Sequence, residues 1–192
     1  MGTDETRSER ALGRLGARLL RGVPRPRVLV GGLGMGFTLR SLLDGLPRSA
    51  RVVVAELLPL VVRWNRVHFG GVSGRPLDDP RTRLYVGDVA DLARGRAAWD
   101  AILLDIDNGP EWMVQKANQA LYGRRGIARL CASLRPGGFL AVWSAERERS
   151  FERRVTSMGL RVRRFRPAPS DDHPSGALIY VVSSALRPTR DF

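Results

Sequence analysis

The stretch that decides the fold is Val28-Leu29-Val30-Gly31-Gly32-Leu33-Gly34-Met35-Gly36, which joins an apolar run to four glycines. The apolar run predicts a buried β-strand, and a helical pattern starts directly after the glycines, near Phe37. Glycines allow the backbone to turn sharply away from a strand and allow a ligand to approach the main chain. A strand, a glycine-rich turn and a helix in this order therefore predict the ligand-binding turn of an α/β protein.

Strand and helix patterns alternate on both sides of this turn. Upstream, apolar residues recur on one face of a helix expected over 7–21. Downstream, apolar runs predict strands at 52–55, 84–86, 101–104 and 139–143, and two final strands near 160–165 and 177–183. Helical patterns follow the second strand and also lie at 127–134 and near 146–158. Continuous apolar strands that alternate with amphipathic helices predict an α/β fold, in which a mostly parallel seven-stranded sheet has helices on both faces.

The same patterns support several local interpretations. One face of the helix after the second strand carries Leu57, Leu60, Val61, Trp64 and His68, so we interpret His68 as a packed core residue. The segment 70–81 is rich in Gly, Pro and Asp and predicts a loop, while Arg135-Pro136-Gly137-Gly138 predicts a turn. Cys131 lies in an apolar helical pattern, which favours a packing role over a nucleophilic one.

The composition is that of one globular domain. The chain has 192 residues, of which 43% are hydrophobic, enough to bury a core. No apolar run approaches the ~20 residues of a membrane span, and the polar N-terminus does not resemble a signal peptide. The single cysteine cannot form an internal disulfide, which fits a reducing compartment, so we expect a cytoplasmic protein without membrane contacts.

The charge is strongly basic, with a formal net value of +13. Lys116 is the only lysine among 32 basic residues, a skew typical of a GC-rich genome rather than of selection for phosphate contacts. The arginines are spread along the chain except for a group at 161–166, which we interpret as the solvated face of an edge strand. We therefore do not expect nucleic acid among the partners, although an RNA-binding protein remains an alternative.

Two acidic residues follow the next strands. Glu56 ends the second strand about twenty residues after the glycines, where a carboxylate can accept hydrogen bonds from both hydroxyls of a ribose. The alternative is an acid that interacts with a helix N-terminus. Asp88 follows the third strand, where it can accept from an adenine amino group, and a helix N-cap is the alternative there.

Further polar residues follow the fourth strand in the run Asp105-Ile106-Asp107-Asn108-Gly109-Pro110. Asp105 sits at the carboxyl end of this strand, next to the point where ligands bind in open sheets. If the strand continues, Asp107 points to the same side, and two carboxylates suit a cationic substrate. A metal site completed by Asn108 and a purely structural turn are the alternatives. His173-Pro174-Ser175-Gly176, before the last strand, predicts only a turn.

Taken in order, these motifs resemble the spermidine synthase (polyamine aminopropyltransferase) family, a branch of the class I S-adenosylmethionine-dependent methyltransferase fold. The resemblance runs from Arg27 to Ser184 and includes Asp79-Pro80-Arg81 before the third strand. It implies an N-terminal helix and linker at 1–26, a Rossmann-like methyltransferase domain at 27–184 and a tail at 185–192. The resemblance also implies a role for each candidate site residue. Gly31, Gly32, Gly34, Gly36, Glu56 and Asp88 would bind the cofactor, Asp105 and Asp107 would be catalytic, and Asn108 and His173 would bind substrate.

The chain also departs from the family pattern. Leu33 and Met35 stand where the glycine motif of the family usually has an Asp, and Asn108 takes the place of its second acid. His173 replaces a substrate-side Tyr. Only 26 residues precede the first strand, so we expect no counterpart of the N-terminal β-hairpin domain of the family. A partner chain or a second copy in a homodimer would then cover the crevice, with residues 1–21 as a candidate contact.

The resemblance implies an enzyme that transfers an alkyl group from a sulfonium nucleoside to a small, amine-bearing acceptor. The donor would be S-adenosylmethionine or its decarboxylated form, and the two choices, methyl or aminopropyl transfer, stay open. No metal is expected, although a metal-assisted O-methyltransferase that uses Asp105, Asp107 and Asn108 is an alternative. A non-catalytic nucleoside-binding protein and an RNA-modifying methyltransferase are the alternatives from other classes.

Overall fold

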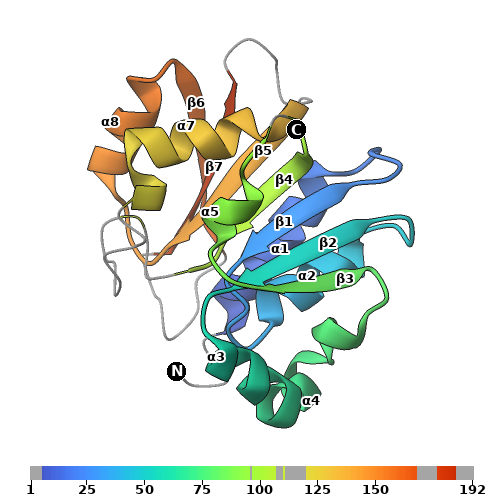
Figure 1. Ribbon diagram of the computed structural model, residues 1–192. Coiled ribbons are helices and arrows are strands. Elements are labelled where there is room, and N and C mark those ends of the chain that lie inside the picture. The colour runs from blue at the N-terminus through green and yellow to red at the C-terminus, as the bar shows by residue number, and fades with distance from the viewer. Residues whose placement is uncertain (1–5, 96, 107–109, 111–119, 168–176, 185–192) are drawn as a thin grey trace.

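The computed structural model describes residues 6–95, 97–106, 110, 120–167 and 177–184 (Figure 1). Its centre is a seven-stranded sheet in the order β3-β2-β1-β4-β5-β7-β6. The strands are β1 (Arg27–Gly31), β2 (Arg51–Glu56), β3 (Thr82–Val86), β4 (Trp99–Leu104), β5 (Leu134–Ser144), β6 (Leu160–Phe165) and β7 (Leu178–Ser184). β1 to β5 pair in parallel, and β7 runs antiparallel to β5 and β6. The predicted α/β class and mostly parallel sheet are confirmed.

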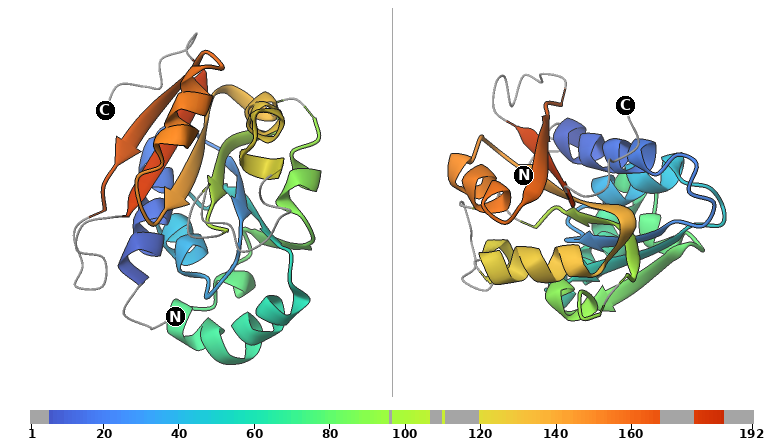
Figure 2. Two further views of the ribbon diagram at one scale, coloured as in Figure 1. Left: turned by 90° about the vertical axis from the view of Figure 1, so that its left-hand side faces the viewer. Right: turned by 90° about the horizontal axis from the view of Figure 1, so that it is seen from above.

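Helices cover both faces of the sheet (Figure 2). The helical segments are α1 (Thr6–Leu19), α2 (Phe37–Gly45), α3 (Pro59–Trp64), the π-helical η2 (Asn65–Phe69), α4 (Gly70–Ser73), the 3₁₀ turn η3 (Pro76–Asp78), α5 (Val89–Leu92), α7 (Arg124–Ala132) and α8 (Arg149–Thr156). Alternate side chains of one strand enter two separate cores: Val28 and Val30 face α1 and α2, whereas Leu29 faces α5, α7 and α8. In the part of the chain that the structure describes, no helix is long and apolar enough to cross a membrane.

The predicted N-terminal helix is part of the main core. Leu12 and Leu15 of α1 are buried in the same cluster as Val28 and Val30. Gly13 allows α1 to approach α2, because a Cβ at this position would overlap the Ser41 hydroxyl and the Thr38 carbonyl oxygen. The apolar face of α1 is therefore buried within this chain.

The helix after β2 differs from the prediction. Its inward-facing residues are Val62 and Asn65, each one position later in the chain than the expected Val61 and Trp64. One residue turns a helix by about 100°, so the predicted apolar face points outward. Trp64 is 44% exposed. The interpretation of His68 as a core residue was wrong, because its side chain is exposed.

Two predicted irregular segments have regular structure. The expected loop at 70–81 contains α4 and η3. The expected turn at 135–138 lies inside β5, where the register shifts from the pair Trp99–Leu134 to the pair Ala101–Phe139. The chain therefore bulges without leaving the sheet, and the Pro-Gly-Gly sequence suits such a bulge.

Two other interpretations agree with the structure. Cys131 is half-buried against the core, and burial raises the pKa of its thiol to about 11, so the thiol stays protonated at neutral pH. β6 is the edge strand of the sheet, and Arg161, Arg163 and Arg164 on it are exposed. Charged side chains of this kind prevent pairing with other chains.

Candidate active site

The carboxyl ends of the neighbouring parallel strands β1 to β4 lie along one edge of the sheet (Figure 1). Main-chain hydrogen bonds continue the strand pairing beyond these ends. They run from Gly32 N–H to the Ala55 oxygen (2.9 Å), from Gly87 N–H to the Glu56 oxygen (2.9 Å) and from Asp105 N–H to the Gly31 oxygen (2.8 Å). The glycine turn, Glu56, the segment before Asp88 and Asp105 are thus neighbours at this edge, as the sequence predicted.

The glycine turn has a sharp main-chain path. Gly32 has a φ of 89°, and a Cβ there would overlap the carbonyl oxygen of Asp105. Only glycine allows the turn to pass this close to the chain after β4. Gly34 also has a positive φ, of 48°, but a Cβ there would meet open space. Gly31 ends β1, and Gly36 is the N-cap of α2.

Glu56 holds the turn in place. Its carboxylate is 8% exposed, and its two oxygens accept hydrogen bonds from the main-chain N–H groups of Leu33 and Leu58, each at 2.9 Å. Leu58 is the N-cap of α3, so the alternative that Glu56 serves a helix N-terminus is correct. A carboxylate oxygen can accept a second hydrogen bond, and this role leaves capacity for a ligand hydroxyl.

Asp88 is a helix cap. One carboxylate oxygen accepts a hydrogen bond from Ala90 N–H at 2.8 Å and so begins α5. The side chain is exposed. The predicted contact with an adenine amino group remains a prediction, because a cap uses only part of the accepting capacity of a carboxylate.

Asp105 lies one residue beyond β4, beside the glycine turn. Its carboxylate accepts a hydrogen bond from the Thr38 hydroxyl at 2.5 Å. Burial raises the pKa of Asp105, and the hydrogen bond from Thr38 opposes that rise. Thr38 was not predicted, since a threonine in the first turn of α2 gives no signal in the sequence until the fold places it against Asp105.

The sequence and the fold of this chain are similar to those of known proteins. No family model matches the chain. Polyamine aminopropyltransferase 2 of Pseudomonas aeruginosa is 35% identical over 135 residues, which cover 68% of this chain and 36% of that protein. The crystal structure of spermidine synthase from Thermotoga maritima superposes with a TM-score of 0.72 at 22% identity, over 97% of this chain and 62% of that one. Human methyltransferase-like protein 13 in complex with SAH gives a TM-score of 0.68 at 17% identity, over 98% of this chain and 84% of that one.

The chain has the fold that spermidine synthases and class I methyltransferases share. It spans about a third of the length of the curated relative that it matches. Three predicted site residues, Asp107, Asn108 and His173, lie outside the described residues. Among the residues that are described, no group of three His, Cys, Asp or Glu side chains is arranged to hold a metal ion. The metal alternative relied on Asp107 and Asn108, so it stays untested.

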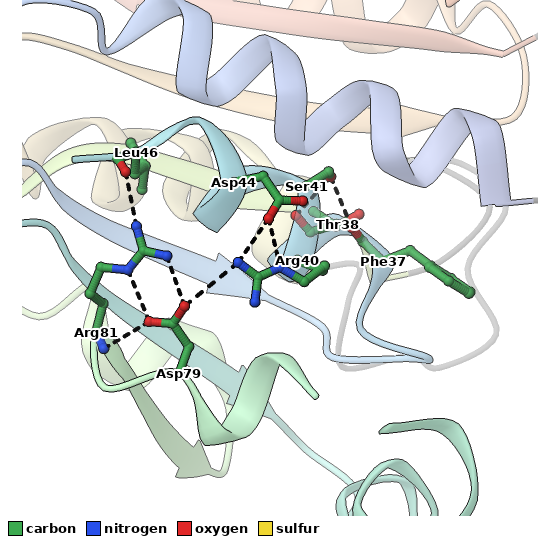
Figure 3. Close-up of polar contacts among 8 residues, drawn as sticks. All are labelled: Phe37, Thr38, Arg40, Ser41, Asp44, Leu46, Asp79 and Arg81. Carbon is green, nitrogen blue, oxygen red and sulfur yellow. Dashed lines mark hydrogen bonds and ion pairs between the residues drawn. The ribbon is translucent and has the colours of Figure 1, made fainter. Parts of the chain in front are cut away.

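The Asp79-Pro80-Arg81 motif forms an ion-pair network that reaches α2 (Figure 3). The Asp79 carboxylate accepts hydrogen bonds from Arg81 Nε at 2.9 Å and from Arg81 Nη2 at 2.7 Å. Arg81 Nη1 donates to the Leu46 carbonyl at 2.9 Å, just after α2, and Arg40 Nη2 lies 3.6 Å from Asp79. The network joins the start of β3 to α2, which carries Thr38.

We expect Asp79→Asn to lower the free energy of unfolding by about 1 to 2 kcal/mol at pH 7. Hydrogen bonds from Arg81 lower the pKa of Asp79 from 3.8 to about 2. The folded-state pKa is depressed, so this stabilisation is present above pH 4 and is lost as the pH falls toward 2. Urea titrations at pH 7 and at low pH measure the difference. Asp78→Asn, at an exposed neighbour, is the matched control. Equal effects of the two substitutions would contradict the role of the network.

Proposed function

We propose that this chain transfers an aminopropyl group from a decarboxylated S-adenosylmethionine donor to a small amine. The observation that carries the proposal is the place of Asp105, a half-buried residue beside the glycine turn and one residue past β4. The similarity to a polyamine aminopropyltransferase supports aminopropyl rather than another alkyl group.

The residues around the glycine turn support the binding of the donor. Open space beside Gly34 leaves room for a ligand, and Glu56 lies at the base of the turn. We assign the ribose hydroxyls to Glu56 and the adenine amino group to Asp88, both as acceptors of hydrogen bonds. The nearby negative charge of Asp105 suits a sulfonium group.

Asp105 is the proposed base. The lone pair of the acceptor amine attacks the carbon attached to sulfur, and the carbon–sulfur bond breaks with its electron pair moving to sulfur. The sulfonium thereby becomes the neutral thioether of methylthioadenosine, and the amine proton passes to Asp105. Free alkyl amines have a pKa near ~10, so a base is needed at neutral pH. Asp107 as a second anchor, and Asn108 and His173 as substrate contacts, complete the proposal.

Methyl transfer is the second candidate, and one observation favours it. The turn carries Leu33 and Met35, so it lacks an acid that would repel the carboxylate of S-adenosylmethionine. Leu33 is buried and its N–H is bound to Glu56. The two candidates therefore differ in which donor the turn accepts, since the decarboxylated donor has no carboxylate.

Calorimetric titration with decarboxylated S-adenosylmethionine, S-adenosylmethionine and methylthioadenosine distinguishes the candidates. We expect the decarboxylated donor to bind tighter than S-adenosylmethionine. Turnover on a panel of small amines then tests transfer itself. Preference for S-adenosylmethionine would replace the proposal by methyl transfer, and donor binding without turnover would support a non-catalytic nucleoside-binding protein.

We expect Glu56→Gln to weaken binding of all three ligands by a similar factor, about 10- to 100-fold, since it loses charge-assisted hydrogen bonds to a shared ribose. Circular dichroism confirms that the variant is folded, because Glu56 also binds two main-chain N–H groups. Asp91→Asn, in the first turn of α5 and not assigned to the ligand, is the control for a charge change near this edge. Unchanged binding of methylthioadenosine to folded Glu56→Gln would rule out the ribose contact.

A further inference from the structure

A groove between α1 and α2 is lined mainly by arginines. It has a volume of about 310 Å³. Arg10, Arg14 and Arg18 of α1 border it together with Arg21, which follows the helix. The other bordering residues are Ala17 of α1 and Ser41, Asp44 and Gly45 of α2. The arginines of α1 are four residues apart, so they form one row along the helix. These arginines are dispersed along the sequence, and the helix brings them together on one face.

The positive charge of this row is not balanced within the groove. Among the described residues, Arg14 and Arg18 form no ion pair with an acidic side chain. Asp44 is the acid that borders the groove, and its carboxylate is already bound by Arg40 at 2.9 Å. Like charges four residues apart repel each other, so the row is destabilising until an anion lies beside it.

The row leads to the edge of the sheet where the candidate site lies. The Arg10 guanidinium stacks over the Phe37 ring, with 4.6 Å from its carbon to the ring centroid, and Phe37 precedes Thr38. At the other end, a Cβ at Gly45 would lie 2.6 Å from the Ala17 Cβ. α1 and α2 therefore run in the same direction, and the Arg10 end of the row is the end near Asp105.

We propose that this groove binds the phosphate backbone of a nucleic-acid strand, with Arg10, Arg14 and Arg18 each contacting phosphate. A rise of about 1.5 Å per residue places successive guanidinium groups about 6 Å apart along the helix, a spacing similar to that of consecutive phosphates in a strand. A linear row suits a linear polyanion better than it suits a single phosphate. The residues that border the groove include no aromatic side chain, so recognition is by charge and is independent of base sequence.

Fluorescence anisotropy with a labelled oligouridine of ~12 nucleotides tests the proposal. We expect wild-type protein to bind in the range of about 1 to 100 μM, with affinity falling steeply as salt is added. Substitution of Arg10, Arg14 and Arg18 together by Gln is expected to weaken binding at least ~10-fold and to reduce the salt slope by about 2, the value for three phosphate contacts to a single strand. The corresponding Lys variant, which keeps the charge, is expected to retain most of the affinity.

The matched control removes the same charge elsewhere. Gln at Arg161, Arg163 and Arg166, on and beside the edge strand β6, lowers the net charge equally and is expected to change affinity by less than about twofold. Equal losses in both triple variants would overturn the proposal, because net charge alone would then explain binding. No binding of wild-type protein at about 50 mM salt would overturn it as well.

Two further measurements distinguish strand binding in the groove from binding of a small anion and from the proposed transferase activity. Oligothymidine is expected to bind like oligouridine, since both have a phosphate backbone. If inorganic triphosphate binds and neither oligonucleotide binds, the groove is a small-anion site and the proposal is overturned. Transfer to a small amine is expected to be unchanged in the Gln variant of Arg10, Arg14 and Arg18. The groove and the proposed transferase activity are therefore tested independently.

Discussion

Asp105→Asn is expected to lower kcat/KM for aminopropyl transfer by about 10²- to 10⁴-fold, the range for loss of a general base. Asparagine keeps the size of the side chain and an oxygen that can accept from the Thr38 hydroxyl, so the site stays assembled. Its amide cannot take the proton of the attacking amine. Steady-state kinetics measure the loss, and calorimetry with methylthioadenosine shows whether donor binding is preserved. A variant that retains activity within about twofold would remove Asp105 from the mechanism.

The pH profile gives a second test of Asp105. Burial raises the pKa of its carboxyl, and only the deprotonated form acts as a base, so activity should rise with pH above the usual carboxyl range. Thr38→Val removes a hydrogen bond that stabilises the carboxylate and is expected to move this rise to higher pH. Ser41→Ala is the control, since its hydroxyl donates to main-chain oxygens of its own helix. An unchanged pH profile in the Thr38→Val variant would contradict the assignment of Asp105 as the base.

The substitution Asp105→Asn is also expected to stabilise the folded protein. Folding raises the pKa of this carboxyl, so its protonated form stabilises the folded state at a pH below the pKa of the unfolded chain. This stabilisation is lost as the pH rises through the pKa of the folded state. Above the unfolded pKa, Asp105 therefore destabilises the folded state, and Asp105→Asn should raise the thermal midpoint. Reduced activity together with increased stability is typical of a buried catalytic group.

Gly32→Ala is expected to lower the free energy of unfolding by about 3 to 5 kcal/mol, the range of severe point substitutions. The new Cβ would overlap the carbonyl oxygen of Asp105, and both segments are held by main-chain hydrogen bonds to neighbouring strands. The φ of 89° adds strain for any residue with a side chain. Urea or thermal unfolding measures the effect.

Gly34→Ala is the matched control for this prediction. It also has a positive φ, but its Cβ would meet open space, so the expected cost is only about 1 to 2 kcal/mol. The difference between the two variants isolates the close approach of the turn to the chain after β4. Similar losses at both positions would show that backbone conformation, and not this approach, makes Gly32 necessary.

Much of the candidate site was predictable because it depends on local order along the chain. Strand, glycine turn and helix follow one another in sequence, and acids that follow parallel strands must share one edge of the sheet. Glu56 and Asp105 were placed correctly for this reason. The assignment of Asp88 was less complete, since a cap and a ligand contact require the same residue type at the same position.

The sequence alone determined the alternation of strands and helices, the glycine turn and the shared edge of Glu56 and Asp105, because periodicity and strand direction are local properties. Only the tertiary structure decided which face of a helix is buried and which distant side chains meet. The outward rotation of Trp64, the contact of Thr38 with Asp105 and the row of arginines beside α2 all depend on packing. Packing between segments far apart in the chain has no local pattern, since each partner is compatible with many others until the fold selects one.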